Sequence, residues 1–266
     1  MEPLGELARA LSIPELAGPF LLAAAAYLAA GTAFFILLRP DPFLLARRLD
    51  RKASAATAGA GRRDDTPAGR TSIDPGVLVG ATVMVLTQIS MIAIMTMTPV
   101  HMRAHDHSLG AVGLVIGIHI GAMYLPSPVT GALVDRIGRT PMAIASGITL
   151  LGAGLVGAAG SGDSLWLIIA ALTLLGLGWN FGLIAGTALV VDATEPRNRP
   201  KVQGSIDVFI ALAGAGGGAM SGVVMSGTSF AVLSGAGGLL ALLLIPVLFW
   251  AHRNGAAVGR RVAPHP

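Results

Sequence analysis

The chain has 266 residues, of which 53% are hydrophobic and 12% charged, and its mean hydropathy is +0.73. A soluble domain carries roughly 25% charged residues, so this composition excludes an ordinary soluble protein and predicts a membrane protein. The absence of cysteine excludes disulfides, thiolate catalysis and cysteine-based metal sites. The net charge of +4 comes from basic residues that flank apolar runs, so lipid headgroups explain it better than nucleic acid does.

Seven apolar runs are long enough to cross a bilayer, which takes about 20 residues. They lie near residues 17–38, 77–98, 109–133, 142–160, 164–190, 203–225 and 229–251. The sequence therefore predicts an all-α, polytopic membrane protein with about seven transmembrane helices. It divides into an amino-terminal segment with one helix (1–38), a linker (39–76), a six-helix region (77–252) and a tail (253–266).

The basic residues predict the orientation. All but two of the 18 lysines and arginines fall in alternate segments between the runs, and only Arg9 and Arg103 lie on the other side. Because cytoplasmic segments are the basic ones, the amino terminus is predicted outside and the carboxyl terminus in the cytoplasm. We expect a multi-pass protein of the cell (plasma) membrane, that is, of a cell inner membrane.

Residues 39–76 form the one long polar segment. Pro40 and Pro42 end the first run, and the stretch through Arg70 has no apolar periodicity. A solvated cytoplasmic linker is favoured over a lipid-binding segment, although arginine pairs could bind anionic lipid. Pro75 suits the start of the next helix.

A short charged turn, Gly131–Pro141, separates the third and fourth runs. Glycine suits such a turn because it allows close backbone approach or a positive φ. Asp135 stands beside Arg136 and Arg139, so its carboxylate could form charge-assisted hydrogen bonds that fix the two helix ends.

The spacing of this turn resembles the signature loop of major facilitator superfamily transporters. The matching positions are Gly131, Asp135, Arg136, Gly138 and Arg139, whereas Thr140 departs from the family's second basic residue. The segment Asp192–Gly204 is similar to the loop that joins the fourth and fifth helices of one half of such a transporter. The resemblance covers about residues 17–252.

This resemblance implies a partial major facilitator fold: the last helix of the first half followed by the second six-helix half. It implies secondary active, ion-coupled transport of a small solute, such as a drug or metabolite, with no cofactor. The partners are then the lipid bilayer, the small-molecule substrate, and either a second copy of the chain or a separately encoded amino-terminal half. The alternative is a truncated, non-transporting membrane protein or a partner-dependent subunit.

His119 lies near the middle of its run, and ionisable groups inside a membrane are costly. Gly113, Gly117 and Gly121 form a stripe that we expect to be the close-packing face of that helix. His119 then points nearly opposite, toward lipid or a polar cavity. It is either a proton-coupling or substrate-contacting residue, or a neutral histidine bonded to a backbone carbonyl.

Four further residues could orient a solute near the midplane: the amides Gln88 and Asn180, and the aromatic residues Trp179 and Tyr124. The alternative, which we favour for the amides, is hydrogen bonding between helices. Pro126 and Pro128 predict a kink in the helix that carries Tyr124.

Asp207 shares a face with Gly214, Gly218 and Gly222, so we expect it to point toward packed protein. Pairing with a basic group of a cytoplasmic loop is favoured over proton transport. His101, His105 and His107 have a spacing that could hold a metal, but no second ligand cluster supports this, and solvated histidines are favoured.

Two other classes of membrane protein require residues that this sequence does not have. An enzyme would need a nucleophile with a base, or a metal–carboxylate cluster, within one leaflet, and the sequence has neither. A retinal-binding protein needs a lysine inside a span, and both lysines, Lys52 and Lys201, lie outside the apolar runs.

Overall fold

The computed structural model describes residues 2–14, 17–41, 44–45, 48–49, 51–52, 74–160 and 162–253. The regular elements of this part are helices, which confirms the all-α prediction. They are α1 (Glu2–Ala10), α2 (Gly18–Leu37), α4 (Pro75–Ala104), α5 (Leu109–Tyr124), α6 (Ser127–Ile137), α7 (Arg139–Ala159), α8 (Leu165–Asp192), α9 (Arg199–Gly227), α10 (Phe230–Ala241) and α11 (Leu244–Arg253). The chain forms two compact units, residues 1–71 and 72–266.

The first unit contains α1 and α2. The helix α2 carries no charged residue and exposes large side chains such as Phe20, Tyr27 and Phe35. Beyond its end, the guanidinium of Arg39 lies over the Phe35 ring, 4.2 Å from the ring centroid. Such an apolar, single helix is typical of a membrane span.

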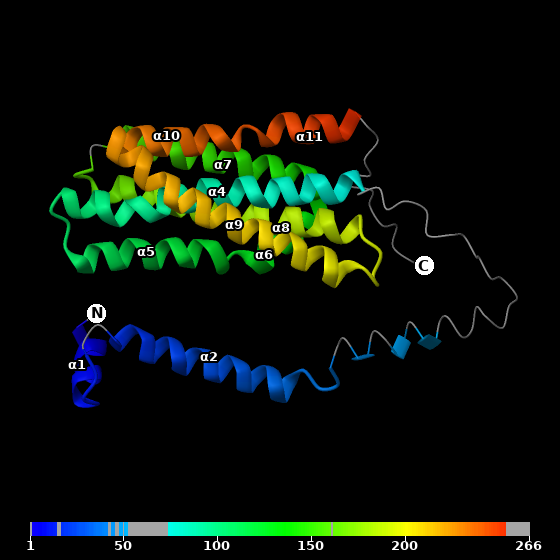
Figure 1. Cartoon of the computed structure of the whole chain (residues 1–266), viewed down its shortest axis with the longest axis horizontal. Helices are drawn as coiled ribbons and strands as arrows, with labels where there is room; N and C mark the ends of the chain where they lie inside the picture. Colours follow the sequence, from blue (N-terminus) through cyan, green and yellow to red (C-terminus); the bar gives the residue numbers. More distant parts are fainter. Residues whose placement is uncertain are drawn as a thin grey trace, which may run out of the picture. The chain divides into compact units, whose positions relative to one another are not determined.

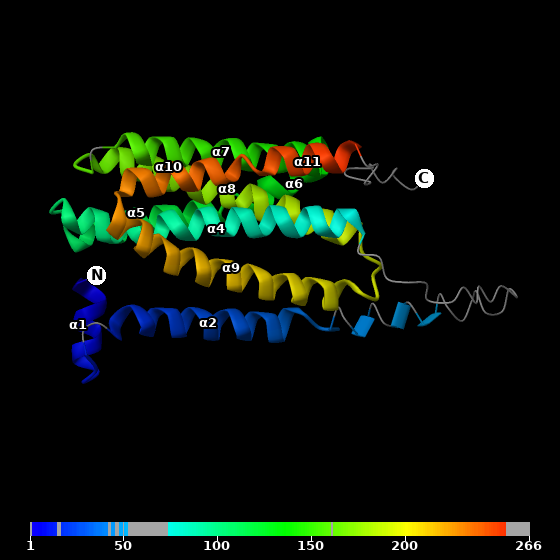
Figure 2. The same cartoon turned by 45° about the horizontal axis from the view of Figure 1, so that its top comes forward.

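The second unit, called here the six-helix unit, consists of α4 to α11. Its helices run side by side along one direction (Figures 1 and 2). Helices α4 and α8 pack against each other at its centre; α5 packs on α8, α9 packs on α4, and α7 and α10 pack on the central pair. Most of its buried apolar side chains lie between these helices.

Two helix crossings in this unit depend on glycine. A Cβ at Gly80 of α4 would lie 2.6 Å from the Gly186 carbonyl oxygen of α8. A Cβ at Gly154 of α7 would lie 2.5 Å from the Ser234 carbonyl oxygen and 2.6 Å from the Gly238 Cα of α10. Because these neighbours are backbone atoms, which cannot rotate away, the helices approach closely only where a side chain is missing.

The prediction of seven spans is confirmed. Within the described residues, seven helices are long and apolar enough to cross a membrane: 20–37, 75–104, 109–137, 139–159, 165–192, 199–227 and 230–250. The expected helix start at Pro75 is also confirmed, since Asp74 caps α4 by accepting a hydrogen bond of 2.7 Å from the Gly76 amide. The remainder of the predicted linker and the tail after Arg253 lie almost wholly outside the described residues.

Two spans are divided. The third is broken between α5 and α6 at Leu125 and Pro126, where the sequence predicted a kink. The last is broken between α10 and α11 at Leu242 and Leu243, which the sequence analysis did not predict. Pro246 follows this second break by three residues, and its missing N–H removes one hydrogen bond of the helical ladder.

Candidate functional site

An amide and two aromatic rings meet at the junction of three helices. The Trp179 indole Nε1 of α8 donates a hydrogen bond of 2.8 Å to Gln88 Oε1 of α4. The Tyr124 ring, at the end of α5, meets the Trp179 ring edge-on with centroids 5.7 Å apart. We call Gln88, Tyr124 and Trp179 the amide–aromatic cluster. Three residues that the sequence analysis considered separately thus lie together.

One ring of the cluster is buried and the other is exposed. The Trp179 side chain is 8% exposed, whereas Tyr124 is 59% exposed. Because Trp179 occupies the Gln88 oxygen, the Gln88 amide nitrogen remains as a donor, and it has no hydrogen-bond partner among the described residues. A Cβ at Gly214 of α9 would lie 3.3 Å from this nitrogen, so the donor faces α9.

Asn180 has the structural role that the sequence analysis favoured for the amides. Its Nδ2 donates to the Met123 carbonyl at 2.8 Å and to Ser127 Oγ at 2.9 Å, and its Oδ1 accepts from Thr130 Oγ1. These partners flank the break between α5 and α6, where prolines remove backbone donors. Asn180 is therefore buried with its amide occupied, and it fastens the broken span to α8.

The predicted orientation of His119 was wrong. The buried stripe of α5 is Val112, Val115, His119 and Met123, which packs on α8, and His119 is 0% exposed. Its Nδ1 lies 2.8 Å from the Leu172 carbonyl oxygen, while Nε2 is buried without a partner. The glycine stripe of α5 instead lines an apolar surface groove of about 690 Å³. A Cβ at Gly117 would meet no atom within 4 Å, so within the described chain this stripe is open.

The expectation for Asp207 was also wrong. In this part of α9 it is Ile206 that packs, with Met84 and Val190, and the next residue is rotated by about 100° around the helix. Asp207 is consequently exposed, and its Oδ1 accepts a 2.9 Å hydrogen bond from Gln203 Nε2. The predicted pairing with a basic loop residue is absent from the contacts of the described residues.

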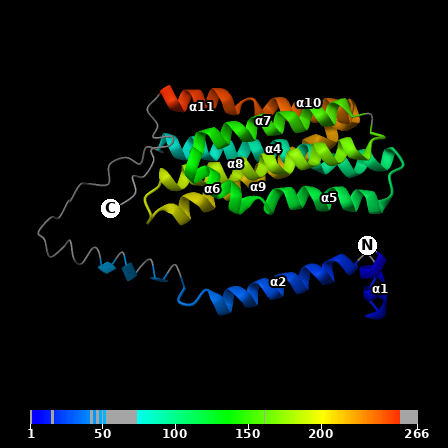
Figure 3. The ribbon, with the colours of Figure 1, turned by 180° about the vertical axis from the view of Figure 1, so that it is seen from behind.

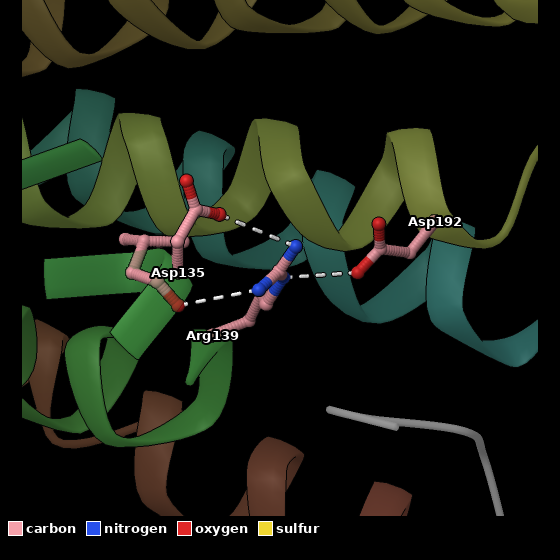
Figure 4. Close-up of polar contacts among 4 residues, drawn as sticks. Asp135, Arg139 and Asp192 are labelled. Carbon is pink, nitrogen blue, oxygen red and sulfur yellow. Dashed lines mark hydrogen bonds and ion pairs between the residues drawn. The ribbon is translucent and has the colours of Figure 1, made fainter. Parts of the chain in front are cut away.

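The charged turn is tied to α8 by one arginine. Arg139 Nε donates to Asp192 Oδ2 at 2.9 Å, and its Nη2 lies 3.5 Å from Asp135 Oδ1 (Figure 4). Its Nη1 donates to the Val134 carbonyl at 3.3 Å. We call Arg139 with these three partners the arginine bridge. It joins the ends of α6, α7 and α8.

The ion pairing of the turn differs from the one that the sequence predicted. The sequence suggested one carboxylate between two guanidiniums, but the structure has one guanidinium between two carboxylates, and Arg136 is exposed. Asp192 is the stronger partner, since the Asp135 side chain is 75% exposed. Gly138 has φ +107°, which requires glycine as expected, whereas a Cβ at Gly131 would meet no atom within 4 Å.

The three loop histidines lie at the opposite end of the unit, and in the described residues no group of three side chains could hold a metal ion. The His101 ring stacks on Phe230 with centroids 4.2 Å apart and lies 4.4 Å from the His105 ring. His107 Nε2 lies 2.8 Å from the Gly162 carbonyl oxygen. All three are half-buried and contact neighbouring segments of the chain, and these contacts were not part of the prediction of solvated histidines.

Comparison with known proteins adds an independent observation. Residues 78–263 match the family model described as Major Facilitator Superfamily. The chain is 60% identical over 248 residues to the uncharacterized MFS-type transporter YdeG of Bacillus subtilis. It is 54% identical over 257 residues to the uncharacterized MFS-type transporter YddS of the same species, and 32% identical over 235 residues to the riboflavin transporter RfnT of Brucella anthropi.

These matches include most of this chain but only part of each relative. They cover 93%, 94% and 84% of this chain, and 57%, 57% and 54% of YdeG, YddS and RfnT, respectively. The chain thus spans little more than half the length of the curated relatives that it matches.

Proposed function

Because the chain belongs to the major facilitator superfamily, we propose that it moves a small solute, such as a drug or metabolite, across a membrane as part of a secondary active transporter. The chain is a multi-pass membrane protein of a transporter family and not an enzyme. Residues 77–252 would form one half of the transporter, with 39–76 as linker and 253–266 as tail. In such transporters the two halves rock about a solute site near the midplane.

The amide–aromatic cluster is the observation that carries this proposal. Trp179 links Gln88, which keeps a free amide donor, to the exposed Tyr124 ring, and both Gln88 and Trp179 lie near the middle of their helices. An apolar surface with a few fixed polar groups is what a small-molecule site requires. Gln88 would donate to the solute, Tyr124 would pack on it, and Trp179 would hold both in position.

The chemistry of the cluster suits a planar, uncharged ring system. Aromatic rings bind such groups edge-on or in offset stacks, and an amide N–H recognises a ring carbonyl or nitrogen. The name of RfnT, a riboflavin transporter, is consistent with a solute of this kind. Asn180, which lies beside Trp179, would support the site rather than contact the solute, because its amide is already bonded.

His119 is our candidate for coupling transport to protons. Among the described residues it is the only titratable side chain that is buried, and its Nε2 has no partner. An imidazole takes up a proton in the physiological pH range. Asp207, being exposed near the start of α9, has less support as a second coupling candidate.

The six-helix unit would act together with a partner, which is either a separately encoded amino-terminal half or a second copy of the chain. Support comes from the open positions on α5 and α9, since a Cβ at Gly117, Gly216 or Gly222 would meet no atom within 4 Å. The alternative function is a partner-dependent subunit that does not itself transport.

We propose that the carboxyl terminus and the arginine bridge lie on the cytoplasmic side. All but two of the basic residues support this orientation. Since the chain lacks cysteine, single cysteines can report it: Arg136→Cys should react with a membrane-impermeant maleimide only after permeabilisation, and Ala104→Cys should react in intact cells. The reverse labelling pattern would contradict the orientation.

Flux measurements test the function. Liposomes holding the purified chain should show little uptake of riboflavin or of a panel of planar fluorescent solutes. Uptake should appear when the part of YdeG outside the match is reconstituted with it. Absence of uptake in both preparations, with correctly folded chains, would favour the non-transporting alternative.

Within an active assembly, Trp179→Phe should raise KM for the transported solute about fivefold with little change in folded yield. The substitution keeps a ring but removes the N–H that positions Gln88, and such a hydrogen bond contributes about 1 kcal/mol. Trp166→Phe is the matched control, because Trp166 of the same helix is 78% exposed. If the two substitutions raised KM equally, the amide–aromatic cluster would not be part of the solute site.

A further inference from the structure

Three histidines lie at one end of the six-helix unit, where three interhelical connections meet. His101 lies in the last turn of α4, His105 ends that helix, and His107 lies in the short turn before α5. The connections from α4 to α5, from α7 to α8 and from α9 to α10 all lie at this end (Figures 1 and 3). The other end carries the arginine bridge.

Each ring makes a defined contact with another segment. His101 stacks almost parallel on Phe230, the first residue of α10. The His105 ring lies against Gly162, where a Cβ would be 2.5 Å from Nε2, and its Nδ1 lies 2.9 Å from the His101 carbonyl oxygen. His107 Nε2 lies 2.8 Å from the Gly162 carbonyl oxygen. We call His101, His105 and His107, with Gly162 and Phe230, the histidine clasp.

The rings of the histidine clasp lie close together. His101 and His105 have centroids only 4.4 Å apart, and the His105 ring lies directly against the Gly162 backbone. The cavity next to His101, which Gly162 and Phe230 line together with apolar residues of α7 and α8, has a volume of only about 10 Å³, which leaves no room there for a solvation shell. The rings are only half-buried, but two imidazolium charges at this separation would still repel each other.

Acidification changes the net charge of the clasp and of the charged groups around it. Arg103 and Asp106 belong to the connection between α4 and α5, and Asp163 to the connection between α7 and α8. The segments of α5, α7, α8 and α10 that adjoin the clasp have no charged residue. With neutral imidazoles two carboxylates therefore face one guanidinium, whereas with three imidazolium groups the cations outnumber the carboxylates by two.

We propose that the histidine clasp is an acid-released latch: it holds the ends of α4, α8 and α10 together at neutral pH and lets them separate when its imidazoles take up protons. Imidazoles take up protons between about pH 8 and 5, the range in which the two sides of a cell membrane differ. Separation allows each imidazolium to become hydrated and moves the like charges apart. The latch concerns the opening of this end and requires no particular solute.

The absence of cysteine allows a direct distance measurement in the full chain. Spin labels at Ala104→Cys, the end of α4, and Trp166→Cys, near the start of α8, are both placed at exposed positions. In lipid nanodiscs, double electron–electron resonance should give one distance at pH 7.5 and a longer distance at pH 5.0. The ratio of long to short populations should rise up to about tenfold per pH unit for each proton that the open state binds in excess.

Two sets of variants separate the latch from general acid sensitivity. His105→Gln and His107→Gln keep hydrogen-bonding groups but cannot become charged, so each should reduce the pH response, and together they should abolish it. His252→Gln is the matched control, because His252 belongs to α11, whose end is away from the clasp. An unchanged distance in the parent chain, or a response that survives the double substitution, would overturn the proposal.

A further variant keeps all three histidines. Asp163 directly follows Gly162 in the chain, and a carboxylate next to the clasp would stabilise an imidazolium in the closed state. With Asp163→Asn the closed state tolerates protons less well, so the midpoint of opening should move to higher pH. A midpoint that stays or moves to lower pH would contradict the latch, even if the double histidine variant failed to fold.

Discussion

Replacing Gly154 by leucine is expected to abolish accumulation of the folded chain. A Cβ at this position would lie 2.5–2.8 Å from three backbone atoms of α10, at Ser234 and Gly238. Backbone atoms inside a helix cannot turn aside, so α7 and α10 would have to separate along their whole contact. We expect a loss of at least about 3 kcal/mol, measured as the yield and thermal stability of the monodisperse peak in detergent.

Gly216→Leu is the matched control for this substitution. It adds the same side chain to a helical glycine, but a Cβ at Gly216 of α9 would meet no atom within 4 Å. Its yield should equal that of the parent chain. Because leucine forms helices better than glycine does, equal losses for both leucines would show that the added bulk itself, rather than the crossing of α7 and α10, decides the outcome.

Removing the guanidinium of the arginine bridge is expected to have the second largest effect. Arg139→Ala would leave Asp135 and Asp192 facing each other and would free the Val134 carbonyl. A charge-assisted hydrogen bond of a partly buried group contributes about 1.5–3 kcal/mol, so we expect a loss of about 2 kcal/mol in thermal unfolding. Under the proposed function, the choice of solute should not change, because the bridge lies away from the amide–aromatic cluster.

The two carboxylates of the bridge should differ. Asp192→Asn should cost about 1–2 kcal/mol because the 2.9 Å bond is lost, whereas Asp135→Asn should cost less than about 0.5 kcal/mol because that side chain is exposed. A larger effect at Asp135 would mean that the turn is held by a contact outside this chain.

The number and position of the spans could be predicted from the sequence because a bilayer imposes a length of apolar residues that is easily recognised. The breaks within spans were harder to predict. Pro99 lies inside α4, which continues through it, whereas Pro246 follows the break before α11. Whether a helix continues past a proline depends on what neighbouring helices offer its backbone, and a single sequence does not contain that information.

The face of each helix was predicted less well, for a physical reason. On a helix that is apolar all round, a glycine stripe marks a surface where another backbone can approach, but it does not identify that backbone. In α5 the stripe through Gly117 faces open space, and the bulkier stripe through His119 packs on α8. The bond between Trp179 and Gln88 joins residues 91 apart in sequence and was likewise beyond prediction.

The arginine bridge illustrates a similar limit. Both of its carboxylates lie in motifs that the sequence analysis singled out, but in separate ones, Asp135 in the charged turn and Asp192 at the start of the second motif. Only the packing of α6 and α7 against α8 brings the second carboxylate to Arg139. Two charged motifs predicted on the same side of a membrane were a usable signal for this contact.

The glycines that meet no neighbour provide a means of mapping the surroundings of this chain by deep mutational scanning. Every substitution at Gly117, Gly204 or Gly222 adds atoms to space that the described chain leaves empty. When abundance and activity are scored separately, abundance at these codons should be indifferent to side-chain size. Any dependence of activity on size there must then come from outside the six-helix unit, and the positions that show it would outline, residue by residue, the footprint of whatever covers α5 and α9.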